Sequence, residues 1–225
     1  MGDVNTSSRA VVFSDFDGTI TQEETFSLLM KTFAPEASAL MIPRLLSGEI
    51  TLREGVPAVV ETIPSSRFPD MLEFMKKAKL RPGFESFLEK LAKRSIPFIV
   101  LSGSLEPLVM ATLAPFQSLI HRVVAAAVDS QGPFLHVSSP HARHDELVYK
   151  PGILSEYPGS KKIVIGDSVT DYSMARAGDI VFARSLLAED LVKSAIPYHK
   201  FETFFDISNN IDKIQEKEEN SLEAT

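Results

Sequence analysis

The chain has 225 residues, 44% of them hydrophobic, and its 23 Lys and Arg against 30 Asp and Glu give a formal net charge of −7. This acidic balance argues against nucleic acid or an anionic membrane as a general partner, and the absence of Cys excludes disulfides, thiolate chemistry and Cys-ligated metal centres. No apolar run approaches the roughly 18 residues of a membrane span, and the polar start of the chain has no signal core, so we expect no membrane partner and a cytoplasmic location.

The first predicted element is a buried strand that ends at two acids. Residues 11–13 form a short apolar run, Asp15 and Asp17 follow one residue apart, and Gly18 supplies a turn. Ligands of open α/β sheets bind beyond the carboxyl ends of the strands. Two acids so close together repel each other unless they share a cation. The segment therefore predicts a site for a hard cation and for chemistry on an anion.

Residues 21–80 carry helical patterns and no strand pattern. Thr51 and Glu54 have the spacing of a capping box, which predicts the start of a helix. Arg81-Pro82-Gly83 then marks a boundary or hinge. The expected helices of this all-helical insert are 24–33, 37–46, 51–63 and 65–79.

From residue 83 onward the pattern alternates between helices and strands. Continuous apolar runs, such as 96–101 before Ser102 and Gly103, are typical of buried parallel strands. The turn sequence at 129–132 lies between two strand-like runs and predicts a β-hairpin. The expected strands are 96–101, 123–128, 133–137, 161–165, 180–183 and 198–200, and the expected helices are 84–94, 105–114, 150–157, a helix that ends at 177, 186–194 and 201–214.

Parallel strands with helices between them predict an α/β fold with a Rossmann-like sheet, interrupted once by the helical insert. The predicted core domain consists of residues 1–20 and 81–213, and the helical domain of residues 21–80. Residues 214–225 are polar and are expected to form a disordered tail.

Asp15, Ser102 and Asp167 each follow a predicted strand directly. Right-handed crossovers put the carboxyl ends of the strands on one edge of the sheet, so we expect these three residues in one crevice. Lys150 and Asp171 are expected to join them there. Carboxylates, a hydroxyl and an ammonium in one place suit phosphoryl transfer.

The chemistry expected of this set is nucleophilic attack on a phosphate monoester. The dianionic substrate repels a carboxylate nucleophile unless Mg²⁺ and an ammonium cancel charge. A Ser hydroxyl and the N–H groups at a helix start bind phosphate oxygens. Asp15 would attack phosphorus and form an aspartyl phosphate, and Asp17 would protonate the leaving group and then activate water.

Four stretches in this order resemble the motifs of the haloacid dehalogenase superfamily of phosphatases. They are DFDGT at 15–19, LSG at 101–103, Lys150, and GDSVTD at 166–171. The resemblance covers about residues 11–200. It implies the superfamily's parallel-sheet core, with the helical insert as its C1 cap.

The resemblance also implies roles for individual residues. Asp15, Asp17 and Asp167 would hold Mg²⁺, Asp17 through its backbone carbonyl. Asp171 would lie outside this set and hold a metal-bound water or Lys150. The residues implied to bind the phosphate or the rest of a small phosphorylated substrate are Gly18, Ser102, Gly103, Lys150 and Glu24.

Within the superfamily the chain resembles both the phosphoserine phosphatases and the methionine-salvage phosphatases. MKTFAP at 30–35, REGV at 53–56 and the pair Lys150-Pro151 are more similar to the salvage enzymes. The cap Arg with which phosphoserine phosphatases bind the substrate carboxylate falls at about Val56, although Arg53 lies nearby. The Cys-rich insert that some salvage enzymes carry before the Lys is missing. The resemblance implies a methylthio enol phosphate as the substrate, with phosphoserine or another small phosphate as the alternative.

Several of these residues also have simpler interpretations. Ser102 alone would be an ordinary helix N-cap. Glu24 stands where such caps place an acid that faces the substrate, but the helix dipole also favours Glu at a helix start. Lys161 and Lys162 are further candidates for the catalytic lysine, but both lie at the beginning of the predicted strand 161–165 and so at the wrong end of the sheet.

Other functions remain open at this stage. A phosphomutase uses the same nucleophile but must exclude water from the aspartyl phosphate. A receiver-like signalling module also uses Asp, Lys and Mg²⁺, but it lacks a helical insert. His136, His141 and His144 cluster near the hairpin, where a solvated loop is favoured over a transition-metal site. The protein is expected to be a monomer or a homodimer.

Overall fold

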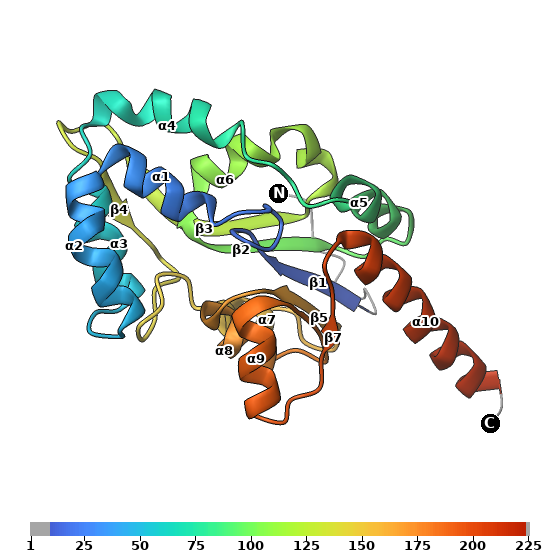
Figure 1. Ribbon diagram of the computed structural model, residues 1–225. Coiled ribbons are helices and arrows are strands. Elements are labelled where there is room, and N and C mark those ends of the chain that lie inside the picture. Colours follow the sequence, from blue (N-terminus) through green and yellow to red (C-terminus); the bar gives the residue numbers. More distant parts are fainter. Residues whose placement is uncertain (1–9, 224–225) are drawn as a thin grey trace.

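A seven-stranded sheet forms the centre of the computed structural model, which describes residues 10–223 (Figure 1). The leader at residues 1–9 and the last two residues of the predicted tail lie outside the described residues. The strands are β1 (Ala10–Asp15), β2 (Phe98–Leu105), β3 (Arg122–Asp129), β4 (His136–Ser138), β5 (Lys161–Gly166), β6 (Ile180–Ala183) and β7 (His199–Lys200). Their order is β4-β3-β2-β1-β5-β6-β7, and every neighbouring pair is parallel except β3 and β4, which form the predicted hairpin. The predicted α/β class is confirmed.

Helices cover both faces of this sheet (Figure 1). One face carries α5 (Phe84–Lys93), α6 (Glu106–Leu113) and α10 (Phe204–Glu223), and the other carries α7 (Lys150–Ser155), α8 (Tyr172–Arg176) and α9 (Ser185–Lys193). Three short 3₁₀ turns are η1 (Ser65–Arg67), η2 (Ala114–Leu119) and η3 (Val169–Asp171). Strand side chains alternate between the faces, so Val12 packs into one core and its neighbours Val11 and Phe13 into the other.

The insert between β1 and α5 consists of α1 (Thr25–Phe33), α2 (Pro35–Leu46), α3 (Leu52–Val60) and α4 (Phe68–Met75). The predicted capping box starts α3: Glu54 N donates to Thr51 Oγ1 at 3.2 Å, and Thr51 N donates to Glu54 Oε2 at 2.9 Å. Buried side chains of the insert, such as Leu29 and Val60, belong to the same apolar cluster as Phe84 of α5. The insert therefore shares a core with one face of the sheet.

The two ends of the insert lie side by side. Thr21 and Leu80 form an isolated antiparallel bridge, and Gln22 N donates to Lys79 O at 2.9 Å. The chain thus leaves and re-enters the sheet domain at one place, next to the carboxyl end of β1.

The second strand continues beyond its predicted end. β2 runs through Ser102 and Gly103 to Leu105, and its pairing with β3 shifts register between Leu101 and Leu105. Because α6 begins only at Glu106, the interpretation of Ser102 as a helix N-cap is wrong. A polar Ser-Gly-Ser run has the composition of a strand end, but here the strand pairing resumes at Leu105 after the register shift.

The last helix is also longer than predicted. α10 continues to Glu223, whereas a disordered tail was expected from residue 214. Glu, Lys and Gln dominate residues 213–219, and these residues are strong helix formers, so polarity alone does not oppose a helix there. Lys90 of α5 donates to Ser208 O at 3.0 Å and fixes the first part of α10. Among residues 10–223, no helix is long and apolar enough to cross a membrane.

Candidate active site

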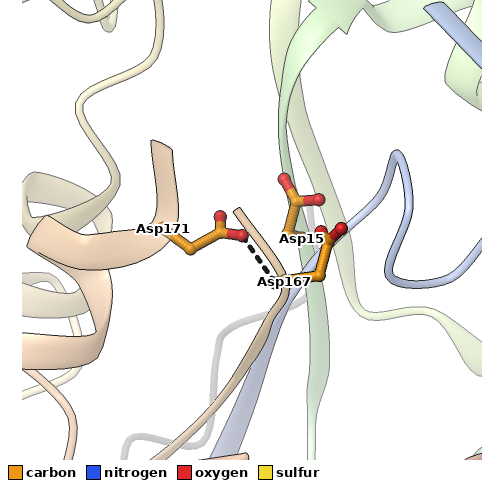
Figure 2. Close-up of side chains that lie close together, drawn as sticks. All are labelled: Asp15, Asp167 and Asp171. Atoms are coloured by element: carbon orange, nitrogen blue, oxygen red, sulfur yellow. Dashed lines mark hydrogen bonds between the residues drawn. The ribbon is translucent and has the colours of Figure 1, made fainter. Parts of the chain in front are cut away.

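Three buried aspartates gather at the carboxyl ends of β1 and β5 (Figure 2). Asp15 is the last residue of β1, Asp167 directly follows β5, and Asp171 ends the η3 turn. One carboxylate oxygen from each lies within 4.8 Å of the others. β1 has β5 on one side and β2 on the other, so the strand order reverses here, as it does at the ligand-binding edge of open α/β sheets.

Lys150 is a buried cation between two of these acids. Its Nζ donates to Asp15 Oδ1 at 2.6 Å and to Asp171 Oδ1 at 2.5 Å, and the residue is 3% exposed. Burial by itself would lower the pKa of Lys150, but the charges of Asp15 and Asp171 outweigh it and raise the pKa. The side chain therefore stays an ammonium at every physiological pH. Lys161 and Lys162 lie at the opposite end of β5.

The crowded carboxyl groups have raised pKa values. Burial, followed by the charge of Asp171, raises the pKa of Asp15 well above its ordinary value, although Lys150 opposes the shift. The same two causes raise the pKa of Asp167 to about 6, which the hydrogen bond from Thr19 partly offsets. The atoms that could bind a metal here are all carboxylate oxygens. The cluster has more carboxyl groups than the single ammonium of Lys150 can neutralise. This donor set fits a hard divalent cation such as Mg²⁺.

Asp171 fixes the loop that carries Asp167. Its Oδ2 accepts from Asp167 N at 2.9 Å (Figure 2) and from Ser168 N at 3.2 Å, while its Oδ1 accepts from Lys150. A Cβ at Gly166 would lie 2.7 Å from atoms of Asp171, so glycine at that position permits the close approach. Both oxygens of Asp171 are thus engaged by donors of the protein.

The side chain of Asp17 turns toward the insert and does not join the three-acid cluster. Its Oδ1 accepts from Thr25 Oγ1 and, at 2.9 Å, from Phe26 N in the first turn of α1. Desolvation raises the pKa of Asp17, and the hydrogen bond from Thr25 counters it. The insert therefore orients this carboxyl group directly. A metal contact through the Asp17 carbonyl remains a prediction.

Gly18 and Glu24 face the acids from the other side. Gly18 has a φ of 73°, and a Cβ there would lie 2.4 Å from Asp167 Oδ2 and 2.7 Å from Glu24 Oε1, so only glycine fits. Although Glu24 as a residue is exposed, its carboxyl group is partly enclosed. This desolvation, followed by the charges of Asp167 and Asp17, raises the pKa of Glu24 to about 8. Glu24 is the N-cap residue of α1 and makes no side-chain capping bond, so a role toward substrate and a role at the helix start both remain predictions.

Gly103, the neighbour of Ser102, lines a cavity of about 330 Å³ that Lys150 also lines. Ser102 is buried, and its Oγ accepts from Ser104 N at 3.0 Å. A Cβ at Gly103 would meet no atom within 4 Å, because this residue faces the cavity. Like Lys150, Thr51 and Leu52 at the start of α3 also line this cavity.

Sequence reasoning missed two contributors to the site. Arg81 was assigned only to a boundary, yet its guanidinium donates to the carbonyls of Gly18 and Thr19. Thr25 was assigned only to a helix, yet it donates to Asp17. A single sequence carries no signal for either contact, because both depend on how the insert folds back onto β1.

The histidines near the hairpin do not gather as a metal site. Within the described part of the chain, the three aspartates are the only group of three or more His, Cys, Asp or Glu that could share an ion. His136 Nδ1 instead lies 2.8 Å from Glu61 Oε1 at the end of α3.

Comparisons with known proteins agree with this geometry. A model of the haloacid dehalogenase-like hydrolases matches residues 12–176. A 2-hydroxy-3-keto-5-methylthiopentenyl-1-phosphate phosphatase of Microcystis aeruginosa (strain NIES-843 / IAM M-2473) is 41% identical over 200 residues, which are 88% of this chain and 95% of that protein. A phosphatase of the same name from Geobacillus kaustophilus (strain HTA426) is 32% identical and covers 92% and 96%. Among solved structures, a phosphoserine phosphatase from T. onnurineus has the same fold, with a TM-score of 0.69 at 18% identity over 93% of this chain and 98% of that chain.

We expect the metal-free protein to lose stability as the pH rises through the titration of Glu24. The pKa of Glu24 is about 8 in the folded protein against 4.5 ordinarily, so the folded protein keeps a proton that the unfolded chain releases. This stabilising contribution is complete below about pH 4.5 and is lost between about pH 4.5 and 8. Thermal unfolding with a chelator measures it, with Glu24→Gln as the control, because the amide does not titrate. The Tm of the wild type relative to the variant should fall across this window, and a constant or rising difference would contradict the assignment.

Proposed function

Because the chain belongs to the haloacid dehalogenase-like hydrolase family and is a phosphatase, we propose that it hydrolyses a small-metabolite phosphate monoester with Mg²⁺ as cofactor and Asp15 as nucleophile. The observation that carries this proposal is the buried network in which Lys150 bonds Asp15 and Asp171 beside Asp167. Asp15 and Asp167 would hold the cation. When bound, it would offset the charge of the phosphate and polarise its oxygens.

The first step is attack on phosphorus by Asp15. Lys150 bonds Oδ1 of Asp15, which leaves Oδ2 as the attacking atom. The bond from Oδ2 to phosphorus forms while the bond from phosphorus to the ester oxygen breaks, and the ester oxygen leaves with the electron pair. An ammonium has three N–H donors and Lys150 uses two of them here, so the third can bind a phosphoryl oxygen. Ser102 and Gly103 would bind the other phosphate oxygens.

Asp17 moves the protons. Its Oδ1 is held by α1, so Oδ2 is the oxygen that protonates the departing ester oxygen. A raised pKa keeps more of this carboxyl group protonated for that step. The resulting carboxylate then takes a proton from a water that attacks phosphorus. The bond between phosphorus and Asp15 breaks, which releases phosphate and restores both acids.

The cavity beside Lys150 supports a substrate with an apolar, uncharged tail. Its apolar side chains belong to Leu52, Leu147, Val148, Val169 and Tyr172. Asp145 and Glu146 also line it, and of the residues that line this cavity only Lys150 is a cation, already bonded to two aspartates. A substrate carboxylate would find no free cation there. We propose that the substrate is 2-hydroxy-3-keto-5-methylthiopentenyl-1-phosphate, the compound named for the relatives, and that the insert at residues 21–80 closes over its methylthio end as a cap.

The positions discussed for a substrate carboxylate agree with this choice. Val56 is buried in the apolar core and does not line the cavity. Arg53 is exposed and does not line it either, and its backbone N–H donates to Asp145 O at 3.3 Å. Phosphoserine, the alternative substrate, would therefore place its carboxylate near Asp145 and Glu146 without a free cation to pair with it.

Asp15→Asn should lower kcat by at least about a thousandfold, because an amide is not a competent nucleophile. The measurement is steady-state release of phosphate from p-nitrophenyl phosphate with Mg²⁺. Asp129→Asn, the same change at an exposed hairpin turn, is the control and should leave the rate unchanged. Activity of Asp15→Asn at a tenth of the wild-type rate would exclude the covalent mechanism.

Gly103→Ala should raise KM or lower kcat for the phosphate ester by about tenfold without loss of stability. The added methyl group meets no protein atom within 4 Å, so it projects into the cavity where substrate would bind. Gly132→Ala on the exposed hairpin is the matched control, since its Cβ would have only one ordinary contact, at 3.6 Å. Unchanged kinetics of Gly103→Ala would mean that substrate does not occupy this cavity.

The enzyme should prefer the methylthio enol phosphate to phosphoserine by roughly 100-fold or more in kcat/KM, since a desolvated, unpaired carboxylate costs about 3 kcal/mol. Both compounds are compared at saturating Mg²⁺ by phosphate release. An equal or greater kcat/KM for phosphoserine would contradict this preference and would indicate that a cation outside this cavity binds the substrate carboxylate.

A further inference from the structure

Arg81 is a buried cation whose side chain bonds only to backbone carbonyls within the described residues. It is 6% exposed. Its Nε donates to Thr19 O at 2.7 Å, its Nη2 donates to Gly18 O and, at 3.1 Å, to Thr21 O, and its Nη1 donates to Glu202 O at 3.2 Å. A guanidinium presents its donors in a rigid planar fork, so it can bind several carbonyls of one turn at the same time. Arg81 thus hydrogen-bonds to three carbonyl groups of the turn from Gly18 to Thr21.

This turn is attached to the acid cluster at its other side. Thr19 Oγ1 donates to Asp167 Oδ1 at 2.8 Å, and Thr19 is completely buried. Gly18 N donates to Thr21 Oγ1 at 3.1 Å, which closes the turn. A shift of the turn would therefore move the hydroxyl that orients Asp167, one of the two carboxylates proposed to hold Mg²⁺.

Arg81 also joins the two chain segments that connect the insert to the sheet domain. The turn from Gly18 to Thr21 leads into the insert, and Arg81 is the first residue after the bridge between Thr21 and Leu80 that closes it. The backbone N–H of Arg81 donates to Ile20 O at 2.8 Å. Arg81 therefore lies at the junction between the insert and the sheet domain.

We propose that Arg81 is a positioning residue: by holding the turn from Gly18 to Thr21, it fixes the Thr19 hydroxyl on Asp167 and thereby sets the affinity of the acid cluster for Mg²⁺. This inference rests on the proposed function only in naming Mg²⁺ as the ion of the cluster. Arg81 itself bonds none of the three aspartates. Its effect on Asp167 is exerted through Thr19, so a substitution of Thr19 tests the proposal independently.

The test compares Mg²⁺ binding to wild type and variants by isothermal titration calorimetry without substrate. Arg81→Lys keeps the charge but loses the fork, and it should weaken Mg²⁺ binding about tenfold or more, the usual effect of removing a support of a metal ligand. Thr19→Val removes only the hydroxyl bond to Asp167 and should weaken binding in the same way, even where Arg81→Lys folds poorly. Hydrogen exchange of the amides of residues 18–21 should accelerate in Arg81→Lys alone.

Lys90→Met is the control for lost stability. Lys90 lies on neighbouring α5 and bonds Ser208 and Asp212 of α10, with no contact to the turn. At an equal loss of Tm it should leave Mg²⁺ affinity within about twofold of wild type. Mg²⁺ affinity within twofold of wild type in both Arg81→Lys and Thr19→Val, or a wild type that binds no Mg²⁺, would overturn the inference. If the wild type binds Mg²⁺ and the variants weaken it, but no phosphate ester is hydrolysed, the proposed function fails and the role of Arg81 stands.

Discussion

Mutual repulsion among the carboxylates at the carboxyl end of β1 is the constraint on which the rest of this structure depends. Asp15, Asp167 and Asp171 place oxygens within 4.8 Å of one another in a buried site, and one ammonium, that of Lys150, bonds two of them. Removing one partner from a buried ion pair typically lowers the free energy of unfolding by about 3–5 kcal/mol, so burial of Asp15 and Asp171 depends on Lys150. The negative charge that remains disfavours the metal-free state and favours a divalent cation. Burial, followed by the charge of Asp171, raises the pKa values of Asp15 and Asp167.

The fold meets this constraint with elements from distant parts of the chain. The parallel order of the sheet puts β1 beside β5, and helix α7 brings Lys150 to the gap between their ends. The insert contributes as well, since α1 holds the Asp17 carboxyl and Arg81 holds the turn that follows it. Its buried side chains also merge with the core on one face of the sheet. Residues that orient the acids therefore belong to, or directly adjoin, the helices proposed to enclose the substrate.

Much of this arrangement could be predicted from the sequence, because it depends on local patterns. Apolar runs that end in acids place Asp15 and Asp167 at strand ends, and the capping box at Thr51 starts a helix where predicted. Local strand patterns failed where tertiary pairing decided the outcome, at the register shift that carries β2 through Ser102. The end of α10 was misjudged for another reason, because polarity was given more weight than the helix propensity of Glu, Lys and Gln. The contacts of Arg81 and Thr25 join residues whose proximity no periodicity reveals. Likewise, the motifs predict a phosphatase, whereas the character of the cavity proposed to hold the substrate depends on side chains that only the folded chain brings together.

The measurement that tests the central claim most directly is rapid acid quench of the enzyme during turnover of a phosphate ester, followed by peptide mass spectrometry. If Asp15 is the nucleophile, one phosphoryl group should appear on the peptide that contains Asp15, at a level that rises within the first turnover, and it should be absent from Asp15→Asn. Turnover without a phosphorylated peptide, or with the phosphoryl group on another residue, would contradict the account.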